Sequence, residues 1–367
     1  MPTFLRWCLF TALLLLPASV ATAQVAATIT GTVTDEAGNP LPTVNVFIAS
    51  SMNGMTTDNE GRYRLTGVPL GALRLYVSMI GFEPQARDIF VREARVYTID
   101  FQLKEAVYEI GEITVTADNK KWKRQLEKFI GLFIGETPNA SETKIVNPEV
   151  LDFTAKGGEF RAQASEPLII ENKALGYRVT YFLKEFVAIP NQTRYDGEPL
   201  FEDMSAESPE QKAMWNARRD SAFYGSFRHF MLALLNDKVQ EQGFETYSIP
   251  AQQSMGGTAR PGNQRYPIKT AEMLKDGETP GEKILDFEGF VQIIYTREVE
   301  SEAYLRWQNR GPGRPKFRSS LIRLGNGPAI VDLKGDVLDP YGVTFYHYLA
   351  FERVADEVPK EYRPWLN

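Results

Sequence analysis

The sequence predicts an N-terminal all-β sandwich followed by an α+β domain. Between residues 29 and 104, apolar and polar residues alternate in several short segments. Gly, Asn and Pro separate these segments, as is typical of short strands joined by tight turns. Residues 120–133 then change to helical spacing, and alternation returns further along the chain.

Three rows of apolar side chains define the strands of the predicted sandwich. They are Val44, Val46 and Ile48; Leu73, Leu75, Val77 and Met79; and Tyr97, Ile99, Phe101 and Leu103. Successive side chains on a strand point to opposite sides, so each row is expected to face the core. The residues between them, among them Phe47 and Tyr76, are expected to face solvent.

Three motifs connect this segment to a known family. They read Gly31-x-Val33-x-Asp35-x-x-Gly38-x-Pro40-Leu41, Thr57-Asp58-x-x-Gly61-x-Tyr63 and Val77-Ser78-x-x-Gly81-Phe82. On these motifs, residues 29–104 resemble the carboxypeptidase regulatory-like domain, a transthyretin-like sandwich common in exported proteins of the Bacteroidetes type. The resemblance implies about seven strands and a binding or positioning role without catalysis.

The amino end has the features of a secretory signal peptide covering residues 1–23. Arg6 precedes an apolar run, and Ala21-Thr22-Ala23 fits a cleavage site. Cleavage would start the mature chain near Gln24 and remove Cys8, the single cysteine, so no disulfide or thiolate site is expected. We expect a periplasmic or outer-membrane-associated protein with no transmembrane span. The net charge of −6 makes both nucleic acid and anionic lipid poor partners for the chain as a whole.

We divide the mature chain into a sandwich at 24–105, an extended connector at 106–119 and an α+β domain at 120–367. The connector ends in Glu112, Ile113, Thr114, Val115, Thr116 and Ala117, which look like the TonB box of outer-membrane receptors. The chain that follows is too short for a receptor plug and barrel. We interpret the segment as a connecting strand, and strand addition to a periplasmic partner is the alternative.

The α+β domain begins with an amphipathic helix at 120–133, whose Lys120–Arg124 cluster is interpreted as a solvated face. Alternation at 143–190 predicts strands. Ser208 and Ser226 are predicted helix caps, with the second helix ending at Gly243. A long loop at 252–281, strands at 290–296, 321–324 and 329–333, and a terminal helix from Phe345 complete the prediction. Motifs such as Asn147-Pro148-Glu149-Val150-Leu151 resemble an uncharacterised region that follows the same sandwich in other bacterial proteins.

No metallopeptidase site is predicted, because the two histidines lack the required partners. The third residue after His229 is Leu232, and the third after His347 is Ala350, so neither forms a His-x-x-Glu pair. A Ser226–His229 nucleophile is conceivable, but the spacing favours a capping serine beside a packed histidine. We therefore expect no catalytic residue, metal or cofactor.

Three weaker patterns have structural interpretations. Asp58-Asn59-Glu60-Gly61 echoes a calcium loop but fits a hairpin turn better, and Glu105, Glu109 and Glu112 are interpreted as solvated charge. Aromatic residues on the two helices could stack on a sugar ring, but core packing is favoured. They are Trp215, Phe223, Tyr224, Phe227 and Phe230.

The functional expectation is a non-enzymatic exported envelope protein that binds an unknown protein or glycan partner. One alternative is a carbohydrate-binding protein of a polysaccharide-utilisation system. A second is an enzyme whose site lies within residues 143–358. A third is an envelope assembly factor that uses Glu112–Ala117 as an added strand.

Overall fold

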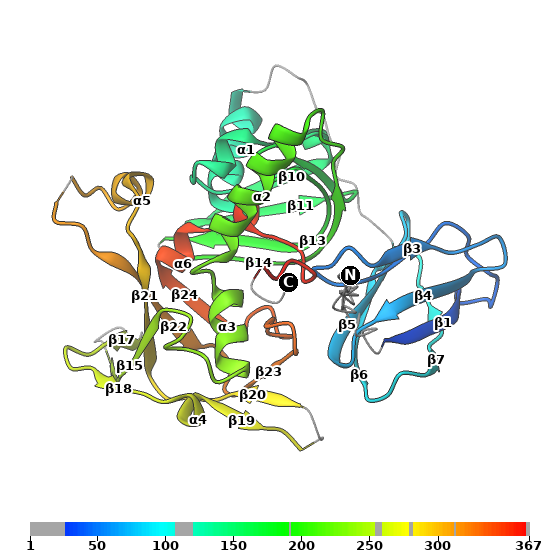
Figure 1. Ribbon diagram of the computed structural model, residues 1–367. Helices are drawn as coiled ribbons and strands as arrows, with labels where there is room; N and C mark the ends of the chain where they lie inside the picture. The colour runs from blue at the N-terminus through cyan, green and yellow to red at the C-terminus, as the bar shows by residue number, and fades with distance from the viewer. Residues whose placement is uncertain are drawn as a thin grey trace, which may run out of the picture.

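The computed structural model describes residues 26–106, 120–190, 192–253, 259–278, 282–311 and 313–364. Three strand-rich units follow one another along the chain (Figure 1). The first is a β-sandwich, and the second and third combine sheets with a few helices, which confirms the predicted fold class. None of the helices among the described residues is long and apolar enough to span a membrane.

The sandwich consists of two four-stranded sheets, with strand orders β4-β1-β7 and β3-β2-β5-β6, and β8 pairs with β1. Strand β1 pairs antiparallel with β4 but parallel with β7 and β8. The eight strands, one more than expected, are β1 (Ala27–Thr34), β2 (Asn45–Ile48), β3 (Gly54–Thr56), β4 (Arg62–Val68), β5 (Gly71–Ser78), β6 (Gln85–Val91), β7 (Val96–Thr98) and β8 (Phe101–Gln102).

The core of the sandwich contains the predicted rows. The first row is fully enclosed, as are most members of the other two, while Met79, Tyr97 and Ile99 are partly covered. At the turn before β4, Gly61 has a φ of 71°. The carboxylate of Asp58 accepts hydrogen bonds from the backbone N–H of Glu60 and Arg62 there, so this motif is a hairpin turn.

One expectation about the sandwich is wrong. The opposite faces of β2 and β5 are predicted to be exposed to solvent, but Phe47 is 0%, Ala49 2% and Tyr76 3% exposed. The second unit covers this face, with Phe182 packed against Phe47 and Tyr76. Alternation located the strands correctly, but both faces of β2 and β5 are buried.

The second unit is built around the long strand β13. Along one edge β13 pairs with β14, and along the other it pairs with β11 and β12. Helix α1 has the predicted bounds and packs Phe129 and Phe133 into the core. The elements are α1 (Lys120–Phe133), η1 (Asn139–Glu142), β9 (Thr143–Ile145), η2 (Pro148–Val150), β10 (Leu151–Lys156), β11 (Glu159–Ala164), β12 (Leu168–Asn172), β13 (Tyr177–Ile189) and β14 (Gln192–Asp203).

Two helices lead from the second unit to the third, α2 (Pro209–Phe223) and α3 (Phe227–Leu235). Both predicted caps are confirmed, since Ser208 Oγ accepts from the Gln211 N–H and Ser226 Oγ from the His229 N–H. The predicted end of α3 at Gly243 is wrong. The side-chain amide of Asn236 donates to the Leu232 carbonyl, and Asp237 then takes a φ of 52°, so the helix ends at Leu235.

The third unit contains a five-stranded sheet of order β18-β15-β21-β22-β24 and a three-stranded sheet of order β19-β20-β23. A separate hairpin joins β16 and β17. The elements are β15 (Phe244–Ile249), β16 (Ala251–Gln253), β17 (Ala259–Pro261), β18 (Tyr266–Pro267), α4 (Thr270–Met273), β19 (Leu274–Asp276), β20 (Lys283–Leu285), β21 (Phe290–Val299), α5 (Glu302–Trp307), β22 (Phe317–Leu324), β23 (Ala329–Val331), β24 (Val343–His347), α6 (Tyr348–Phe351) and η3 (Val354–Asp356).

The structure confirms the three predicted strands of this unit and corrects two other predictions. The described part of 252–281 is not one loop, because short strands there pair with β15, β20 and each other. The helix predicted from Phe345 is also wrong. Residues Val343–His347 form the edge strand β24, whose Phe345 pairs with Ile322, and α6 is a single turn.

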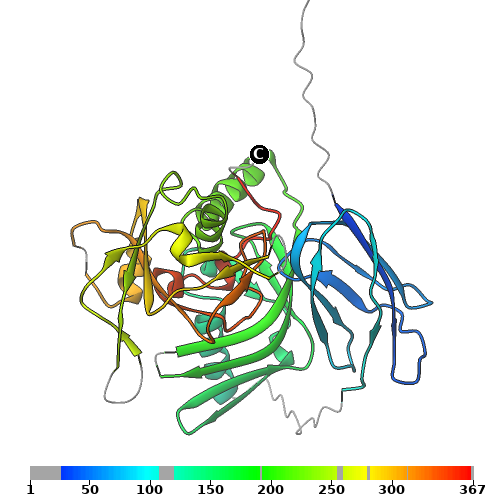
Figure 2. The same ribbon diagram turned by 90° about the horizontal axis from the view of Figure 1, so that it is seen from below.

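The C-terminal segment ties the units together. The Ala355 N–H donates to the Ile134 carbonyl, and the Asn172 side chain donates to the Ala355 carbonyl. The Lys360 amine, 3% exposed, lies 2.8 Å from Asp332 and 3.1 Å from Asp336 of the third unit. Its backbone N–H donates to Ser50 of the sandwich. In both views this red segment lies between the third unit and the green sheet (Figures 1 and 2).

Candidate functional site

The strand singled out from the sequence, Glu112–Ala117, lies within 107–119 and therefore outside the described residues. Glu109 lies there as well. The structure consequently does not test the predicted strand addition.

His229 belongs to the core of the third unit. Its Nδ1 accepts a hydrogen bond of 2.9 Å from the Gly225 N–H, and its Nε2 lies 3.3 Å from Gln242 Oε1. Burial lowers the pKa of His229 to about 4. The hydroxyl of Ser226 caps α3 by accepting the backbone N–H of His229. His347 lies on β24, and no group of three His, Asp or Glu side chains within the described ranges could hold a metal ion.

The aromatic residues of α2 and α3 are mainly core residues. Trp215 is 4% exposed, and its indole N–H donates to the Lys173 carbonyl at 2.8 Å. Phe223 and Phe230 are also buried. Tyr224 and Phe227 are partly buried and pack against the core of the third unit. The packing interpretation of these residues therefore agrees with the structure.

The contact between the sandwich and the second unit has an aromatic centre. The ring centroids of Phe47 and Phe182 are 4.9 Å apart, and those of Tyr76 and Phe182 are 5.6 Å apart. Leu200 of β14 packs against the same three rings. A buried aromatic cluster of this kind holds the two units in one arrangement.

Backbone hydrogen bonds surround this aromatic cluster. The loop after β2 lies against β14, where the Ser50 N–H donates to the Pro199 carbonyl and the Phe201 N–H donates to the Ser51 carbonyl, both at 3.0 Å. Ser51 and Leu200 form a parallel bridge. The sandwich therefore partly extends the second unit's sheet.

An ion pair crosses the same contact. Arg74 of β5 lies 3.3 Å from Glu198 of β14 and 2.7 Å from Asp88 within the sandwich. Glu198 is almost fully buried. Burial raises the pKa of its carboxyl to about 7, although the Arg74 guanidinium opposes this rise.

A cleft of about 430 Å³ opens beside this contact. Turns of the sandwich form one wall, and the third unit and the C-terminal segment form the other; the lining residues are Ala26, Met52, Asn53, Gly54, Gly67, Pro69, Lys334 and Glu361. The volume lies in the range typical of small-molecule sites, which often occur between domains.

The cleft carries both signs of charge. The Lys334 amine lies 3.8 Å from Glu361 Oε1, and Glu361 Oε2 accepts a hydrogen bond of 3.1 Å from the Met52 N–H. Burial lowers the pKa of Lys334, and the nearby Arg363 acts in the same direction. Because an ammonium group has three donors and the pair with Glu361 is long at 3.8 Å, Lys334 can still donate to a ligand.

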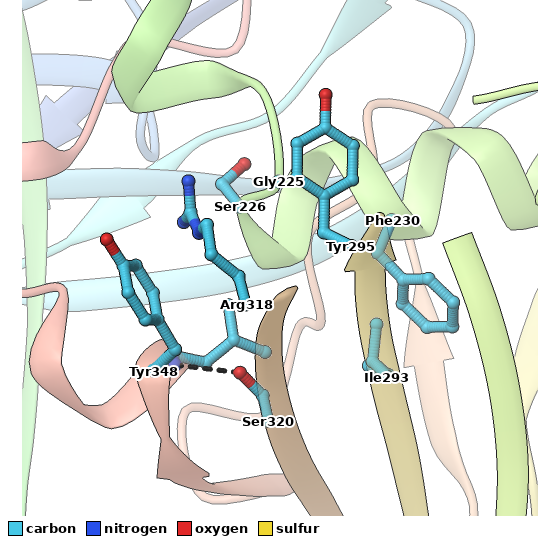
Figure 3. A pocket seen from close by; sticks show the side chains of 9 residues that line it. Gly225, Ser226, Phe230, Ile293, Tyr295, Arg318, Ser320 and Tyr348 are labelled. Atoms are coloured by element: carbon cyan, nitrogen blue, oxygen red, sulfur yellow. Dashed lines mark hydrogen bonds between the residues drawn. The ribbon is translucent and has the colours of Figure 1, made fainter. Parts of the chain in front are cut away.

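Figure 3 shows the side chains that line a second cavity, in the third unit. This cavity is too small for a ligand. Its volume is about 10 Å³, enough for about one water molecule. Arg318 lies beside it, paired with Glu298 at 2.7 Å and with Glu352, and over the Tyr348 ring at 4.1 Å. Burial raises the pKa of Glu352 to about 7. This cluster is a buried junction between β22 and the C-terminal segment.

Neither the cleft nor the contact beside it was predicted from the sequence. The sequence feature that points to the contact is the presence of Phe47 and Tyr76 on strand faces that are predicted to be exposed to solvent. Large aromatic side chains on a solvent face often mark a contact surface. Lys334 and Glu361 carry no comparable signal, because each is an ordinary charged residue in a turn or tail.

Comparison with known proteins places the sandwich in a family. Residues 28–104 match the family model of the carboxypeptidase regulatory-like domain, which confirms the resemblance seen in the three motifs. A TonB-dependent receptor of Formosa agariphila is 40% identical over 87 residues, which is 24% of this chain. The chain spans 8% of that receptor's length.

Similarities to solved structures are weak. A catechol 1,2-dioxygenase from an Acinetobacter species has a TM-score of 0.21 and 14% identity, over 24% of this chain and 55% of that one. A minor pilin of Streptococcus agalactiae has a TM-score of 0.21 and 14% identity, over 23% of this chain and 46% of that one. Neither similarity is close enough to bear on function.

Proposed function

We propose that this chain is a non-enzymatic binding protein of the cell envelope, exported by the signal peptide at 1–23, which takes a small polar ligand in the cleft between its units. The sandwich belongs to a family that is matched in a TonB-dependent receptor, which is compatible with an envelope location. The observation that carries the proposal is the cleft of about 430 Å³ formed where the sandwich meets the rest of the chain.

The walls of the cleft favour a ligand with both polar and charged groups. Lys334 offers a cation and Glu361 an anion, while Asn53 adds an amide and Met52 and Pro69 add apolar surface. The buried contact of Phe47, Tyr76 and Phe182 holds the walls in place. A preformed site of this kind avoids the cost of ordering its walls on binding. Short peptides fit this chemistry, since they carry charges of both signs beside apolar side chains.

The test is a ligand-observed NMR titration with a panel of dipeptides and of neutral and acidic oligosaccharides. Ala26 lines the cleft, so Ala26→Trp should fill it. The matched control is Ala37→Trp, at an exposed position in the turn after β1, at the opposite end of that strand from Ala26. We expect a ligand that binds the unchanged protein and the control but not Ala26→Trp. Equal binding by both variants would place the site elsewhere, and turnover of a panel member would contradict the non-enzymatic role.

A second candidate function is strand addition by Glu112–Ala117 to a periplasmic partner. It is favoured by the match to a TonB-dependent receptor, which is 40% identical over 87 residues. Proline cannot donate to a strand ladder, so Val115→Pro should abolish capture of the periplasmic domain of an energy-transducing protein. Capture that survives this substitution would remove the candidate.

A further inference from the structure

Helix α1 presents a strongly basic surface to solvent. Within Lys120–Phe133 there are five cations and a single carboxylate, Glu127. The five cations are Lys120, Lys121, Lys123, Arg124 and Lys128, and all are exposed. We name these five residues the basic face of α1. It contrasts with the whole chain, whose net charge is −6.

The fold does not require these charges. The apolar side of α1 packs into the core through Phe129 and Phe133. The cations are exposed, although the Lys128 amine lies 4.5 Å from the centroid of the Phe160 ring at the edge of this core. The first turn contains no acidic residue, although carboxylates are favoured near a helix amino end and cations are not. Among the described residues, no ion pair involves Lys120, Lys123 or Arg124. These three cations thus have no charged partner among the described residues that would account for them.

We infer that the basic face of α1 docks on a bilayer surface that carries anionic phospholipid headgroups. Positive charge concentrated on one helical face complements a negative plane, and each such lysine or arginine strengthens binding roughly five-fold. A long soluble polyanion is a poorer fit, because the acidic remainder of the chain would repel whatever extended past the helix. The inference does not depend on the ligand proposed for the cleft.

This docking would leave the sandwich contact undisturbed. Phe133 of α1 packs edge-on against Tyr181 of β13, whereas Phe47 of the sandwich stacks on the next residue, Phe182. Adjacent residues of a strand point to opposite faces, so α1 and the sandwich cover opposite faces of the second unit's sheet. Figure 1 shows α1 at the top of the molecule and the sandwich at its right.

Vesicle co-sedimentation tests the inference, using the protein without residues 1–23 so that the predicted signal peptide cannot bind lipid. The probes are vesicles of phosphatidylcholine, alone or mixed with phosphatidylglycerol. The test variant is Lys120→Gln/Lys123→Gln/Arg124→Gln. The control, Arg64→Gln/Arg92→Gln/Lys104→Gln, removes three exposed cations of the sandwich and changes the net charge equally. Thermal melts establish that both variants are folded.

We expect binding to the anionic vesicles that weakens as salt is added, roughly a hundred-fold loss in the test variant, and little change in the control. Three results would overturn the inference. They are no binding to anionic vesicles at low salt, an equal loss in both variants, and binding that is as strong to phosphatidylcholine alone. Tighter binding of the same face to soluble heparin than to vesicles would also overturn it.

Discussion

Phe47 of β2 stacks on Phe182 of β13, with ring centroids 4.9 Å apart and planes inclined by 29°. Both rings are buried, and Tyr76 lies against both. The sandwich therefore shares an apolar contact with the second unit in addition to its own core. Because backbone hydrogen bonds from Ser50 and to Ser51 adjoin this contact, we expect the two units to unfold together.

Replacing Phe182 by alanine should make the sandwich and the second unit unfold separately. Truncation of a buried phenylalanine costs about 3–5 kcal/mol, and here part of that loss falls on the contact with the sandwich. We expect urea denaturation, followed by fluorescence and by circular dichroism, to change from one transition to two. The control is Phe317→Ala, because that side chain is 51% exposed and its loss should cost under about 0.5 kcal/mol. A single transition with an unchanged midpoint in Phe182→Ala would contradict the coupling.

The sequence correctly predicted the structural features that depend only on residues close together in the chain. The bounds of α1, the caps at Ser208 and Ser226 and the inward rows of the sandwich follow from spacing and local hydrogen bonding. It failed where a distant segment decides the outcome. Phe47 is buried by Phe182, and Phe345 becomes part of a strand because it pairs with Ile322.

The cleft could not be predicted for the same reason. Its walls come from the beginning of the sandwich and from the end of the chain, as Ala26 and Glu361 illustrate. No local pattern brings such residues together. The only indication of the candidate site in the sequence is the pair Phe47 and Tyr76, on strand faces that are predicted to be exposed to solvent.

The ion pair between Arg74 and Glu198 should make the contact sensitive to pH. Arg74→Met leaves a buried carboxylate without its partner, a change that costs about 3–5 kcal/mol in comparable sites. The pKa of Glu198 is raised to about 7 by burial, and losing the guanidinium should raise it further. At pH 5 the carboxyl is neutral and the partner matters less. We therefore expect a large loss of stability at pH 8 and a smaller one at pH 5.

Urea denaturation of Arg74→Met at both pH values measures this difference. Arg74→Met/Glu198→Gln serves as the control, since it removes the charge of the carboxyl as well and should recover part of the loss at pH 8. Asp88 also pairs with Arg74, but it is far more exposed and should contribute little. An equal loss at pH 5 and pH 8 would show that the carboxylate is not the source of the effect.

Glu357, in the C-terminal segment, should destabilise the protein at alkaline pH. Burial raises the pKa of Glu357 to about 7 from 4.5, and the nearby carboxylates Asp336 and Asp356 add to the rise. The pKa of Glu357 is higher in the folded protein than in the unfolded chain, so the protonated carboxyl stabilises the fold. This contribution is fully present below about pH 4.5 and is lost as the pH rises through about 7. Glu357→Gln does not titrate, so it should equal the original protein at pH 4.5 and exceed it at pH 8.

At pH 8 we expect Glu357→Gln to raise the free energy of unfolding by about 2 kcal/mol. This is less than the full shift in the pKa of Glu357 would give, because Glu357 keeps some contact with solvent. Other groups also titrate in this range, and His229 acts in the opposite direction because its pKa is lowered to about 4. The difference between the two proteins removes those contributions. Glu171→Gln is a control, at a partly exposed glutamate of the second unit. An equal increase in the free energy of unfolding at both pH values would show that titration of Glu357 is not the cause.

Ser226 should stabilise a helix and perform no chemistry. Its Oγ accepts the His229 backbone N–H at 3.1 Å, while the imidazole Nδ1 accepts the Gly225 N–H instead of activating the serine. Ser226→Ala should therefore cost about 1 kcal/mol of unfolding free energy, as for other helix caps. Ser208→Ala, at the equivalent cap of α2, should cost about the same. A fluorophosphonate probe should leave Ser226 unlabelled, because a general base must reach the hydroxyl to make it nucleophilic. Labelling of the original protein that disappears in Ser226→Ala would instead indicate an active serine at this helix.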